Sequence, residues 1–524
     1  MNLTLLASFL GSHTSTAMRT AAVKAALQTP AGRKLRDELG AWVIRILPAE
    51  TVVPEIYAEW RPLVRDAMLF MISHLSAARL APKLVEQLEL PPDTTPEARL
   101  LRLIAKVPGL QKIGQVLARN RHLDPALRNA LSQLENGISD VRPEEIRALI
   151  HEQLGRRLET YAVEIEPGML AEATVSAVMR FTWRDPGSGE RQRGVFKVLK
   201  PYVAACFAED LELLQQLAHA LAKKHPEYGR ALPETIMEVR RLLEHEVDFV
   251  REQTTLVEAA RVYKSVRGVR VPRLIPRLST GSITALSEED GVKVTEALAA
   301  ASPRQRRRAA GQLIEALVAV PLFARAARGV FHADPHAGNL LYDRCTGELV
   351  LLDWALTERL TREQRRHVAL LALMLGLRDP VGVSGEIEAL SLDQPLRPAH
   401  ASFVRDQVHQ FIGRLPFSRL PSSMDAMRLL DRLALEGVRF PAGLMMFRKV
   451  LFTLDGILHD LDAPNLQMDM VIARHLVARW MGNLTTLGSP LSLIDWIGVE
   501  SSALLYGARL WVQWAQAALN RAEG

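Results

Sequence analysis

Apolar residues recur at helical spacing along most of this 524-residue chain and alternate with polar residues mainly in one short region. Residues 1 to about 95 predict several helices, which are interrupted by Pro48, Pro54 and the stretch PPDTTPE at 91 to 97. The stretch at 91 to 97 is the clearest linker in this half of the chain. Residues 98 to 160 continue with helical spacing, so the first third of the chain is expected to be helical.

The alternation begins at about residue 170. The segment ATVSAVMRFTWRD predicts a strand, DPGSGE has the composition of a turn, and RGVFKVLKP predicts the return strand of a hairpin. Helices are expected at about 203 to 224 and 233 to 263, followed by short strands near 270 to 286. A further helix over 309 to 328 leads into a polar loop.

The segment that follows this helix, FHADPHAGNLLYDRCTGELVLLD at 331 to 353, carries polar residues in a specific order. Asp334 is followed five positions later by Asn339, and Asp353 ends a short apolar run fourteen residues further on. Protein-kinase-type phosphotransferases need this arrangement, because a loop Asp orients or deprotonates the acceptor while an Asn and a strand-end Asp hold magnesium on the nucleotide phosphates. A carboxylate and an amide carbonyl supply the hard oxygen ligands that magnesium prefers. The alternative is an ordinary polar loop.

A hairpin is predicted inside this segment. Cys345 to Glu348 form the turn, and Leu340 to Tyr342 and Leu349 to Leu352 form the strands. The return strand should place Asp353 beside the loop. After residue 353 nearly everything predicts helix.

A phosphotransferase of this type also needs a strand lysine on the nucleotide phosphates and a helix glutamate that holds this lysine. Lys197 lies in Val-Phe-Lys-Val on the return strand of the first hairpin, and Glu252 lies in HEVDFVREQ on the predicted long helix. A lysine between apolar residues on an inner strand is costly unless it is paired. An edge strand that leaves Lys197 in solvent is the alternative.

The composition indicates in which cellular compartment the protein is expected and which partners it is expected to bind. The chain is 48% apolar and has two cysteines, so it is globular and has no disulfide framework or cysteine metal cluster. A reducing, cytoplasmic location is expected. The net charge of +6 would suit an anionic membrane surface, but no zinc-finger or RNA-recognition signature accompanies it, so nucleic acid is not an expected partner. The densest basic run, Arg304 to Arg308, is expected at a solvated helix end.

Membrane association would have to be peripheral. The start MNLTLLASFLGSHTS lacks the basic leader of a secretory signal, and no run of 18 apolar residues occurs. Residues 496 to 520 predict an amphipathic helix with several tryptophans. Its polar stripe contains Ser502, Arg509, Gln513, Gln516 and Asn520, and Trp496, Leu504, Trp511 and Trp514 face away from it. This helix is expected to lie on the inner face of a membrane, on the protein's own body or on a twin subunit.

The turn that would cover the nucleotide is not rich in glycine. Where protein kinases carry GxGxxG, residues 169 to 176 read MLAEATVS. Without glycines the backbone amides cannot approach phosphates in the same way, which argues against an ordinary protein kinase.

These segments together resemble the AarF/UbiB family of atypical, protein-kinase-like proteins. Lys112 and Gln115 lie in KIGQ, which matches the KxGQ motif of that family, and Glu246 and Asp248 form its ExD motif. Ala171 to Thr174 stand where the family carries an alanine-rich loop. The joint occurrence of these motifs with HxDxxxxN and a strand-end Asp is highly specific.

The resemblance covers roughly residues 100 to 385. It implies an α+β, predominantly helical, bilobal protein-kinase-like fold with helical extensions at both ends. The expected regions are an N-terminal helical region at 1–97, a KxGQ-bearing helical extension at 98–168, a small lobe at 169–290, a large lobe at 291–480 and an amphipathic C-terminal segment at 481–524.

The resemblance also implies roles for individual residues. The catalytic candidates are Asp334, Lys197 and Glu252. The candidates for binding ATP or ADP are Ala171, Ala173, Thr174, Lys197 and Glu288, and those for Mg²⁺ are Asn339 and Asp353. The regulatory candidates are Lys112, Gln115, Glu246 and Asp248, with Lys112 meeting Glu246 or Asp248 so that the KxGQ helices fold over the site.

Members of this family are associated with ATPase activity, isoprenoid-quinone biosynthesis and lipid handling at membranes. An atypical kinase or ATPase of ubiquinone-type or lipid metabolism is therefore the expected function. The expected partners are a nucleotide, a lipid or quinone-precursor ligand, a membrane surface, and a second copy or proteins of quinone biosynthesis.

Two features depart from the family pattern. Glu172 introduces a negative charge where a triphosphate would approach, and the segment Asp353-Trp354-Ala355 lacks the glycine that lets its kinase counterpart flex. Both favour a pseudokinase scaffold as an alternative. A small-molecule phosphotransferase of the aminoglycoside or choline kinase type is the other alternative, although such enzymes have no need of the KxGQ and ExD motifs.

Overall fold

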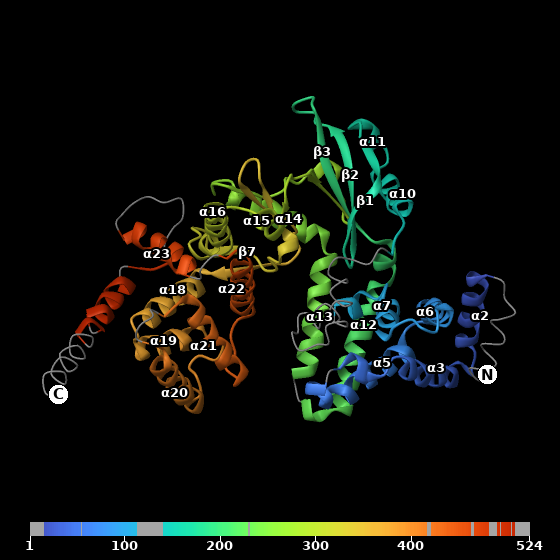
Figure 1. The fold of residues 1–524 in the computed structure, drawn as a ribbon, viewed down its shortest axis with the longest axis horizontal. Coiled ribbons are helices and arrows are strands. Elements are labelled where there is room, and N and C mark those ends of the chain that lie inside the picture. Colours follow the sequence, from blue (N-terminus) through green and yellow to red (C-terminus); the bar gives the residue numbers. More distant parts are fainter. Residues whose placement is uncertain are drawn as a thin grey trace. The chain divides into compact units, whose positions relative to one another are not determined.

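The computed structural model describes residues 15–53, 55–112, 140–228, 231–416, 421–462, 466–480, 490–492, 494–504 and 506–508. The chain divides into two compact units (Figure 1). The first unit contains residues 1–251 and 274–288, and the second contains residues 252–273 and 289–524.

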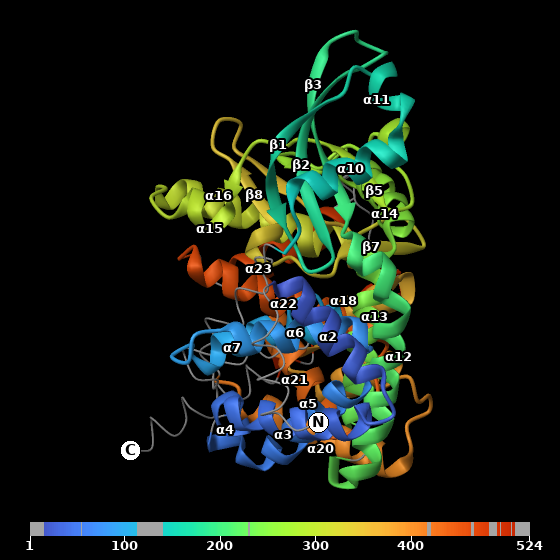
Figure 2. The same cartoon turned by 90° about the vertical axis from the view of Figure 1, so that its right-hand side faces the viewer.

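The first unit opens with a group of helices that share one apolar core. These are α2 (Thr16–Gln28), α3 (Gly32–Ile46), α4 (Ala49–Val52), the 3₁₀ helix η1 (Glu55–Trp60), α5 (Arg61–His74), α6 (Ala77–Glu89) and α7 (Pro96–Ile104). Leu39, Leu84 and Leu217 are buried in this core, which extends onto the long helix α12 (Pro201–Lys224). Figure 2 shows the N-terminal helices gathered beside α12 and α13. The prediction of helix for this part of the chain is confirmed.

The segment at 91 to 97 is a turn inside this unit and does not separate two compact units. The buried side chain of Arg99 fixes it by donating hydrogen bonds to the carbonyls of Gln87, Pro91 and Thr94. Its proline and acidic residues begin α7, where Thr95 caps the helix by accepting from the amide of Ala98.

A four-stranded antiparallel sheet completes the first unit. Its order is β1-β2-β3-β5, with β1 at Glu164–Glu172, β2 at Ser176–Arg184, β3 at Arg191–Leu199 and β5 at Ile283–Ser287. The predicted hairpin is confirmed as β2 and β3, and β1 begins inside the range that was expected to be helical. Helices α10 (Pro143–Leu154) and α11 (Arg156–Thr160) pack on one face of the sheet, where Ile150 meets Phe181 and Phe196 in one core (Figure 2).

The long helix expected at 233 to 263 is in fact two helices. The structure has α13 (Ala231–Val247) and α14 (Phe249–Tyr263), which follow α12 and the 3₁₀ turn η2 (Pro226–Tyr228). Asp248 lies between them, and its carboxylate accepts a hydrogen bond of 2.9 Å from the amide of Arg251. Aspartate at such a position satisfies an amide at the start of a helix and so favours a new helix over continuation.

The second unit contains two small sheets. One has the order β4-β9-β8-β6, and the other pairs β10 with β7. Their strands are β4 (Val269–Arg270), β6 (Val292–Lys293), β7 (Arg328–His332), β8 (Leu340–Asp343), β9 (Glu348–Leu351) and β10 (Thr357–Thr361), and the 3₁₀ turn η3 (Pro276–Leu278) of the first unit precedes β5. The predicted hairpin at 340 to 352 is confirmed as β8 and β9, with Leu340 opposite Leu351. β10 was missed, because helix was expected throughout that region.

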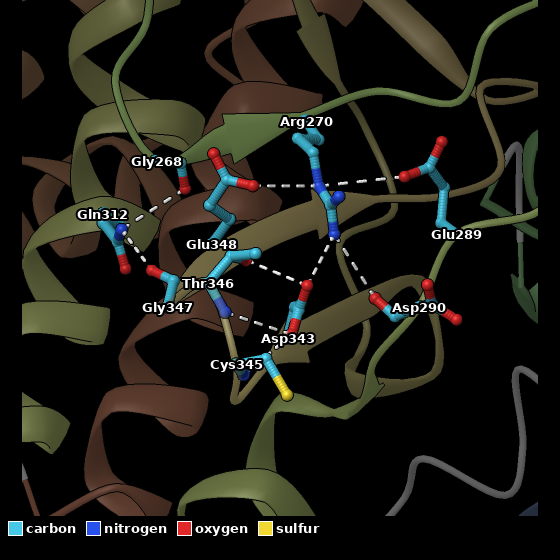
Figure 3. A network of polar contacts seen from close by, with 10 residues as sticks. All are labelled: Gly268, Arg270, Glu289, Asp290, Gln312, Asp343, Cys345, Thr346, Gly347 and Glu348. Carbon is cyan, nitrogen blue, oxygen red and sulfur yellow. Dashed lines mark hydrogen bonds and ion pairs between the residues drawn. The ribbon is translucent and has the colours of Figure 1, made fainter.

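The turn of the β8–β9 hairpin is held by a polar network (Figure 3). The carboxylate of Asp343 accepts from the Thr346 hydroxyl at 2.9 Å and from the Cys345 amide at 2.8 Å, and Arg270 donates to it at 3.1 Å. These hydrogen bonds lower the pKa of Asp343, the Thr346 hydroxyl being the largest cause. Gly347 has a φ of 70°, which suits glycine at the turn. The hairpin register is therefore fixed by its own turn and by β4.

The other elements of the second unit are mostly helical. They are α15 (Val294–Leu298), α16 (Pro303–Ile314), the π-helical turn η4 (Glu315–Ala319), α17 (Val320–Leu322), the 3₁₀ turn η5 (Ala337–Asn339), α18 (Arg362–Gly376), α19 (Pro380–Leu390), α20 (Pro398–Arg414), α21 (Ser423–Leu435), α22 (Ala442–Asp460) and α23 (Leu466–Trp480). The basic run at Arg304 to Arg308 lies in the first turns of α16, as expected.

The helix expected at 309 to 328 ends earlier, at Leu322. Arg365, which is 1% exposed, donates to the carbonyls of Ala324, Ala326 and Ala327 and so satisfies the backbone of the turn that follows. A buried arginine from α18 thus ends this helix and starts β7, and local spacing gave no sign of it.

Among the described residues, no helix is long and apolar enough to span a membrane. Residues 494–504 and 506–508 of the expected C-terminal helix are helical, while Arg509 to Asn520 lie outside the described residues. Its polar side contacts the second unit, since the hydroxyl of Ser502 donates to Asp379 at 2.9 Å and Asp495 pairs with Arg366. Ile494, Ile497 and Leu504 are exposed on the same stretch.

Candidate active site

The predicted catalytic loop connects β7 to β8 in the second unit. His332 ends β7, is 1% exposed and links the loop to the strand that precedes Asp353. Its Nδ1 accepts from the amide of Asp334 at 3.2 Å, so its Nε2 carries the proton and donates to the carbonyl of Leu352 at 2.8 Å. Burial lowers the pKa of His332, which favours this neutral ring. His332 is a positioning residue to which the sequence analysis gave no role, although it stands first in HxD.

Asn339 and Asp353 are brought together by the hairpin register. The amide of Leu352 donates to the backbone carbonyl of Asn339 at 2.9 Å, and the pairing of Leu340 with Leu351 continues this contact. The side-chain amide nitrogen of Asn339 donates to the carbonyl of Asp334 at 3.2 Å, which leaves its amide oxygen for a cation. The two predicted magnesium ligands therefore lie at one end of one hairpin.

Asp353 has a left-handed backbone conformation, with a φ of 52°. This region is uncommon for residues other than glycine, and it concentrates at functional sites when the surroundings hold it. The amide of Ala355 donates to the carboxylate of Asp353 at 3.2 Å, and the residue is exposed. A carboxylate oxygen and the amide oxygen of Asn339 form the hard donor set that fits Mg²⁺. No group of three or more His, Cys, Asp or Glu side chains within the described ranges could hold a metal without further ligands.

Trp354 fixes the segment that follows Asp353. It is 1% exposed, its indole nitrogen donates to the carbonyl of Leu351 at 3.1 Å, and it lies edge-on to His332 with ring centroids 5.2 Å apart. Tyr263 of α14 packs on its other side at 5.6 Å. A buried, hydrogen-bonded tryptophan explains how this segment keeps its conformation without the usual glycine.

A lysine from a distant helix reaches the catalytic loop. The ammonium of Lys449, on α22, lies 3.0 Å from the carboxylate of Asp334. The two residues are 115 positions apart in the chain. Sequence reasoning did not identify Lys449, because no local motif surrounds it.

Lys197 lies on an inner strand of the first unit. Its neighbours across the sheet are Val178 on β2 and Thr284 on β5, so the alternative of a solvated edge strand is wrong. Its ammonium lies 5.7 Å from the ring centre of Phe249, a cation–π contact. Glu252, one turn further along α14, is only 4% exposed. The ion pair between Lys197 and Glu252 stays a prediction.

The segment expected to form the alanine-rich loop, residues 171–174, is the end of β1 and the start of the turn to β2. Ala171 and Ala173 are exposed, and the amide of Ala173 donates to the carbonyl of Ser176 at 2.8 Å. Thr174 is buried, and its carbonyl accepts from the hydroxyl of Tyr202 at 3.3 Å. Two small exposed side chains thus stand where a nucleotide is expected.

Glu172 does not present an unopposed charge to the nucleotide, as the sequence analysis expected. Its carboxylate lies 3.1 Å from the ammonium of Lys200, and the same ammonium lies 2.7 Å from Asp140. All three side chains are almost wholly buried. This cluster, Lys200 with Asp140 and Glu172, ties the start of α12 to the alanine-rich loop.

The predicted contact of the KxGQ motif with the ExD motif is present. Lys112 forms an ion pair with Glu246 in the first unit. Asp248 follows the end of α13 and caps α14, so the single helix predicted at 233 to 263 does not carry both acids. Gln115 lies outside the described residues.

Glu288 follows β5 directly, and its carboxylate forms ion pairs with two arginines. Arg180 donates to it at 2.8 Å, and Arg193 lies at 3.8 Å. Its backbone amide donates to the carbonyl of Arg193 at 3.3 Å, and a role of Glu288 in holding the nucleotide stays a prediction.

Comparison with known proteins agrees with this arrangement. Residues 133–384 match the model of the ABC1 atypical kinase-like domain, and a probable protein kinase UbiB of Xylella fastidiosa is 24% identical over 413 residues, which are 76% of this chain and 71% of the relative. The chain belongs to the AarF/UbiB family. Its kinase-like, predominantly helical α+β fold is likewise as predicted.

Other relatives of this AarF/UbiB chain have a similarly low sequence identity to it. An uncharacterized protein of Synechocystis is 25% identical over 76% of this chain and 67% of its own length. The chloroplastic protein ACTIVITY OF BC1 COMPLEX KINASE 7 of Arabidopsis thaliana is 26% identical over 68% of this chain and 50% of its own. A solved Mycobacterium tuberculosis protein in complex with erythromycin aligns with 17% identity and a TM-score of 0.45, over 68% of this chain and 88% of its own.

Proposed function

We propose that this protein is an atypical kinase or ATPase that acts on Mg-nucleotide and serves isoprenoid-quinone or lipid metabolism at a membrane surface. The observation that carries the proposal is the joined geometry of the catalytic loop and the Asp353 segment. His332 and the backbone of Asn339 both form hydrogen bonds with the backbone of Leu352, and these bonds hold the loop rigidly to the end of the strand. A scaffold with no chemistry would not need this rigidity beside a strained, exposed aspartate.

In this proposal Asn339 and Asp353 hold Mg²⁺ through their oxygens. When bound, the ion would neutralise phosphate charge and orient the terminal phosphoryl group. Asp334 orients the acceptor hydroxyl or water and accepts its proton. Lys197 pairs with the nucleotide phosphates, and Glu252 is expected to hold Lys197 in place. Ala171 and Ala173 are small enough to let the loop approach the nucleotide.

The neutralised charge of Glu172 and the anchored Trp354 remove the two features that favoured a pseudokinase. Glu172 is balanced by Lys200, and the buried Trp354 holds the segment after Asp353 in a defined conformation although the glycine is missing. Both observations favour catalytic competence.

The pathway rests on family membership. The relatives named UbiB are described as probable protein kinases, and the AarF/UbiB resemblance implies isoprenoid-quinone or lipid metabolism. The exposed apolar residues Ile494, Ile497 and Leu504 on the C-terminal helix support a peripheral membrane contact.

The central experiment is Asp353→Asn with a nucleotide-induced shift of the melting temperature as readout. Asparagine tolerates positive φ, so the variant removes the charge and keeps the backbone. Wild type at about 100 times its Kd for Mg-nucleotide should gain roughly 2.7 kcal/mol, and Asp353→Asn should lose this gain. An unchanged shift would overturn the metal assignment.

Asp462→Asn is the matched control. Asp462 also has a positive φ, 54°, and its side chain is 91% exposed. It should behave as wild type. Deleting the gene and measuring isoprenoid quinones tests the pathway, because Asp462→Asn should restore the quinone content and Asp353→Asn should not. Normal quinone and lipid content in the deletion strain would refute the pathway.

A further inference from the structure

The catalytic loop carries no cation of its own. Between Ala333 and Asp343 the sequence contains no Lys or Arg. Transferring a phosphoryl group spreads negative charge over its oxygens, and enzymes meet that charge with Lys, Arg or metal. Lys449 on α22 is a cation that the tertiary structure brings to this loop.

The position of Lys449 is set by the core of the second unit. Phe447, two residues before it, packs edge-on against Phe331 of β7 with ring centroids 5.4 Å apart, and both are buried. Gly443 lets the first turn of α22 approach β10, since a side chain there would meet the carbonyl of Arg359 at 2.9 Å. β7 and β10 pair with each other, so α22 is anchored to both strands that frame the loop.

The ion pair itself is suited to exchange. The side chains of Lys449 and Asp334 are 34% and 21% exposed, so the pair is hydrated on one side. Exposed ion pairs contribute little to stability, and lysine is flexible with three donors. The ammonium can therefore turn from the carboxylate to a phosphoryl oxygen at little cost.

We propose that Lys449 is a catalytic residue that contacts the transferring phosphoryl group and, between turnovers, holds Asp334. This inference rests on the proposed function and deepens it. Lys449 also lies outside residues 133–384, which match the kinase-like domain. The site is therefore completed by a helix that follows that domain.

The acceptor oxygen forms a bond to the terminal phosphorus, and the bond from that phosphorus to the bridging oxygen breaks. The nucleoside diphosphate leaves with the electron pair, and the acceptor proton passes to Asp334. Lys449 stays protonated throughout and donates hydrogen bonds to the phosphoryl oxygens. With water as the acceptor the products are ADP and inorganic phosphate.

The test uses the full chain with Lys449→Met, Lys449→Arg and the control Lys224→Met. Lys224 of α12 forms a comparable pair with Asp66 at 2.7 Å in the first unit. Mg-ATP hydrolysis and the Mg-ATP-induced rise in melting temperature are measured for each. Lys449→Met should lower kcat by roughly 100-fold, as expected for the loss of one donor at a developing charge, and keep the rise in melting temperature. Lys449→Arg should recover part of kcat, and Lys224→Met should match wild type.

Each other result has a definite meaning. Unchanged ATP turnover in Lys449→Met overturns the proposal, because Lys449 and Asp334 would then form an ordinary surface ion pair without a role in the reaction. Faster turnover overturns it in favour of an inhibitory contact. Loss of the melting-temperature rise in both Lys449→Met and Lys449→Arg overturns it in favour of a structural or nucleotide-binding role. A wild type with no rise and no hydrolysis refutes the proposed function itself, and this inference falls with it.

Discussion

Lys200 and Lys449 both pair with aspartate, yet they occupy opposite environments. Lys200 is 1% exposed and lies between Asp140 and Glu172 in the first unit. Lys449 is 34% exposed and pairs with one carboxylate, that of Asp334, in the second unit. The first cluster joins Asp140, which lies within the KxGQ-bearing extension, to the alanine-rich loop, and the second pair joins α22 to the catalytic loop.

This difference in exposure distinguishes a lysine with a structural role from a lysine that is suited to take part in a reaction. A buried charge cannot leave its partners without a large desolvation penalty, so Lys200 is fixed in place. A half-exposed charge can change partners cheaply, which catalysis requires. The ion pair of Lys112 with Glu246 is intermediate, since the two side chains are 14% and 22% exposed. This exposure suits a contact that holds the KxGQ-bearing extension and can still open.

The largest expected effect is that of Lys200→Met. It leaves Asp140 and Glu172 as uncompensated buried carboxylates, so the free energy of unfolding should fall by about 3 to 5 kcal/mol. Chemical denaturation measures this loss. Adding Asp140→Asn and Glu172→Gln to Lys200→Met should recover part of it, because no unpaired charge remains. If the free energy of unfolding of Lys200→Met fell by less than about 1 kcal/mol, the cluster would behave like a solvated ion pair, and the contrast with Lys449 would be wrong.

A smaller effect is expected for Lys112→Ala. The pair with Glu246 is partly hydrated, so the free energy of unfolding should change by only about 1 kcal/mol. We expect ATP turnover, nucleotide preference or self-phosphorylation to change, because the pair secures the KxGQ segment. Wild-type values for nucleotide affinity, turnover and self-labelling would show that Lys112 is merely structural.

The two acids of the ExD motif provide the control for this variant. Glu246→Gln should reproduce the effect of Lys112→Ala. Asp248→Asn should not, since asparagine caps a helix about as well as aspartate and Asp248 is engaged with the amide of Arg251. Equal effects of Glu246→Gln and Asp248→Asn would contradict the assignment of Lys112 to Glu246.

The last effect is confined to acidic pH and concerns His245, which precedes Glu246 in the last turn of α13. Burial, and then Arg251 and Arg241, lower the pKa of His245 to about 4. The unfolded chain takes up this proton near pH 6.5, so the contribution of His245 to stability is present above about pH 6.5 and is lost as the pH falls toward 4. The drop in melting temperature between pH 7 and pH 5 should be smaller in His245→Gln, while His409→Gln, an exposed histidine on α20, should match wild type. Identical pH profiles in all three proteins would exclude this role for His245.

Local spacing predicted the catalytic loop well because its parts are close in the chain. One hairpin joins Asn339 to Asp353, Asp334 lies five residues before Asn339, and hairpin strands can be recognised from alternation and turn residues. The same holds for β2 and β3, which place Lys197 on an inner strand. The break at Asp248 was missed because apolar spacing continues across it, while the capping hydrogen bond depends on the backbone that forms after it.

By itself the sequence determined the family, the kinase-like fold and the order of the candidate catalytic residues, because each depends on short motifs with fixed spacing. Only the tertiary structure decided which charges meet. Lys449 reaches Asp334 through the packing of Phe447 on Phe331. Lys200, at the start of α12, neutralises Glu172 at the end of β1, and Arg365 closes the turn before β7. These contacts join residues that are far apart in sequence, and burial in a shared core, not local propensity, fixes their geometry.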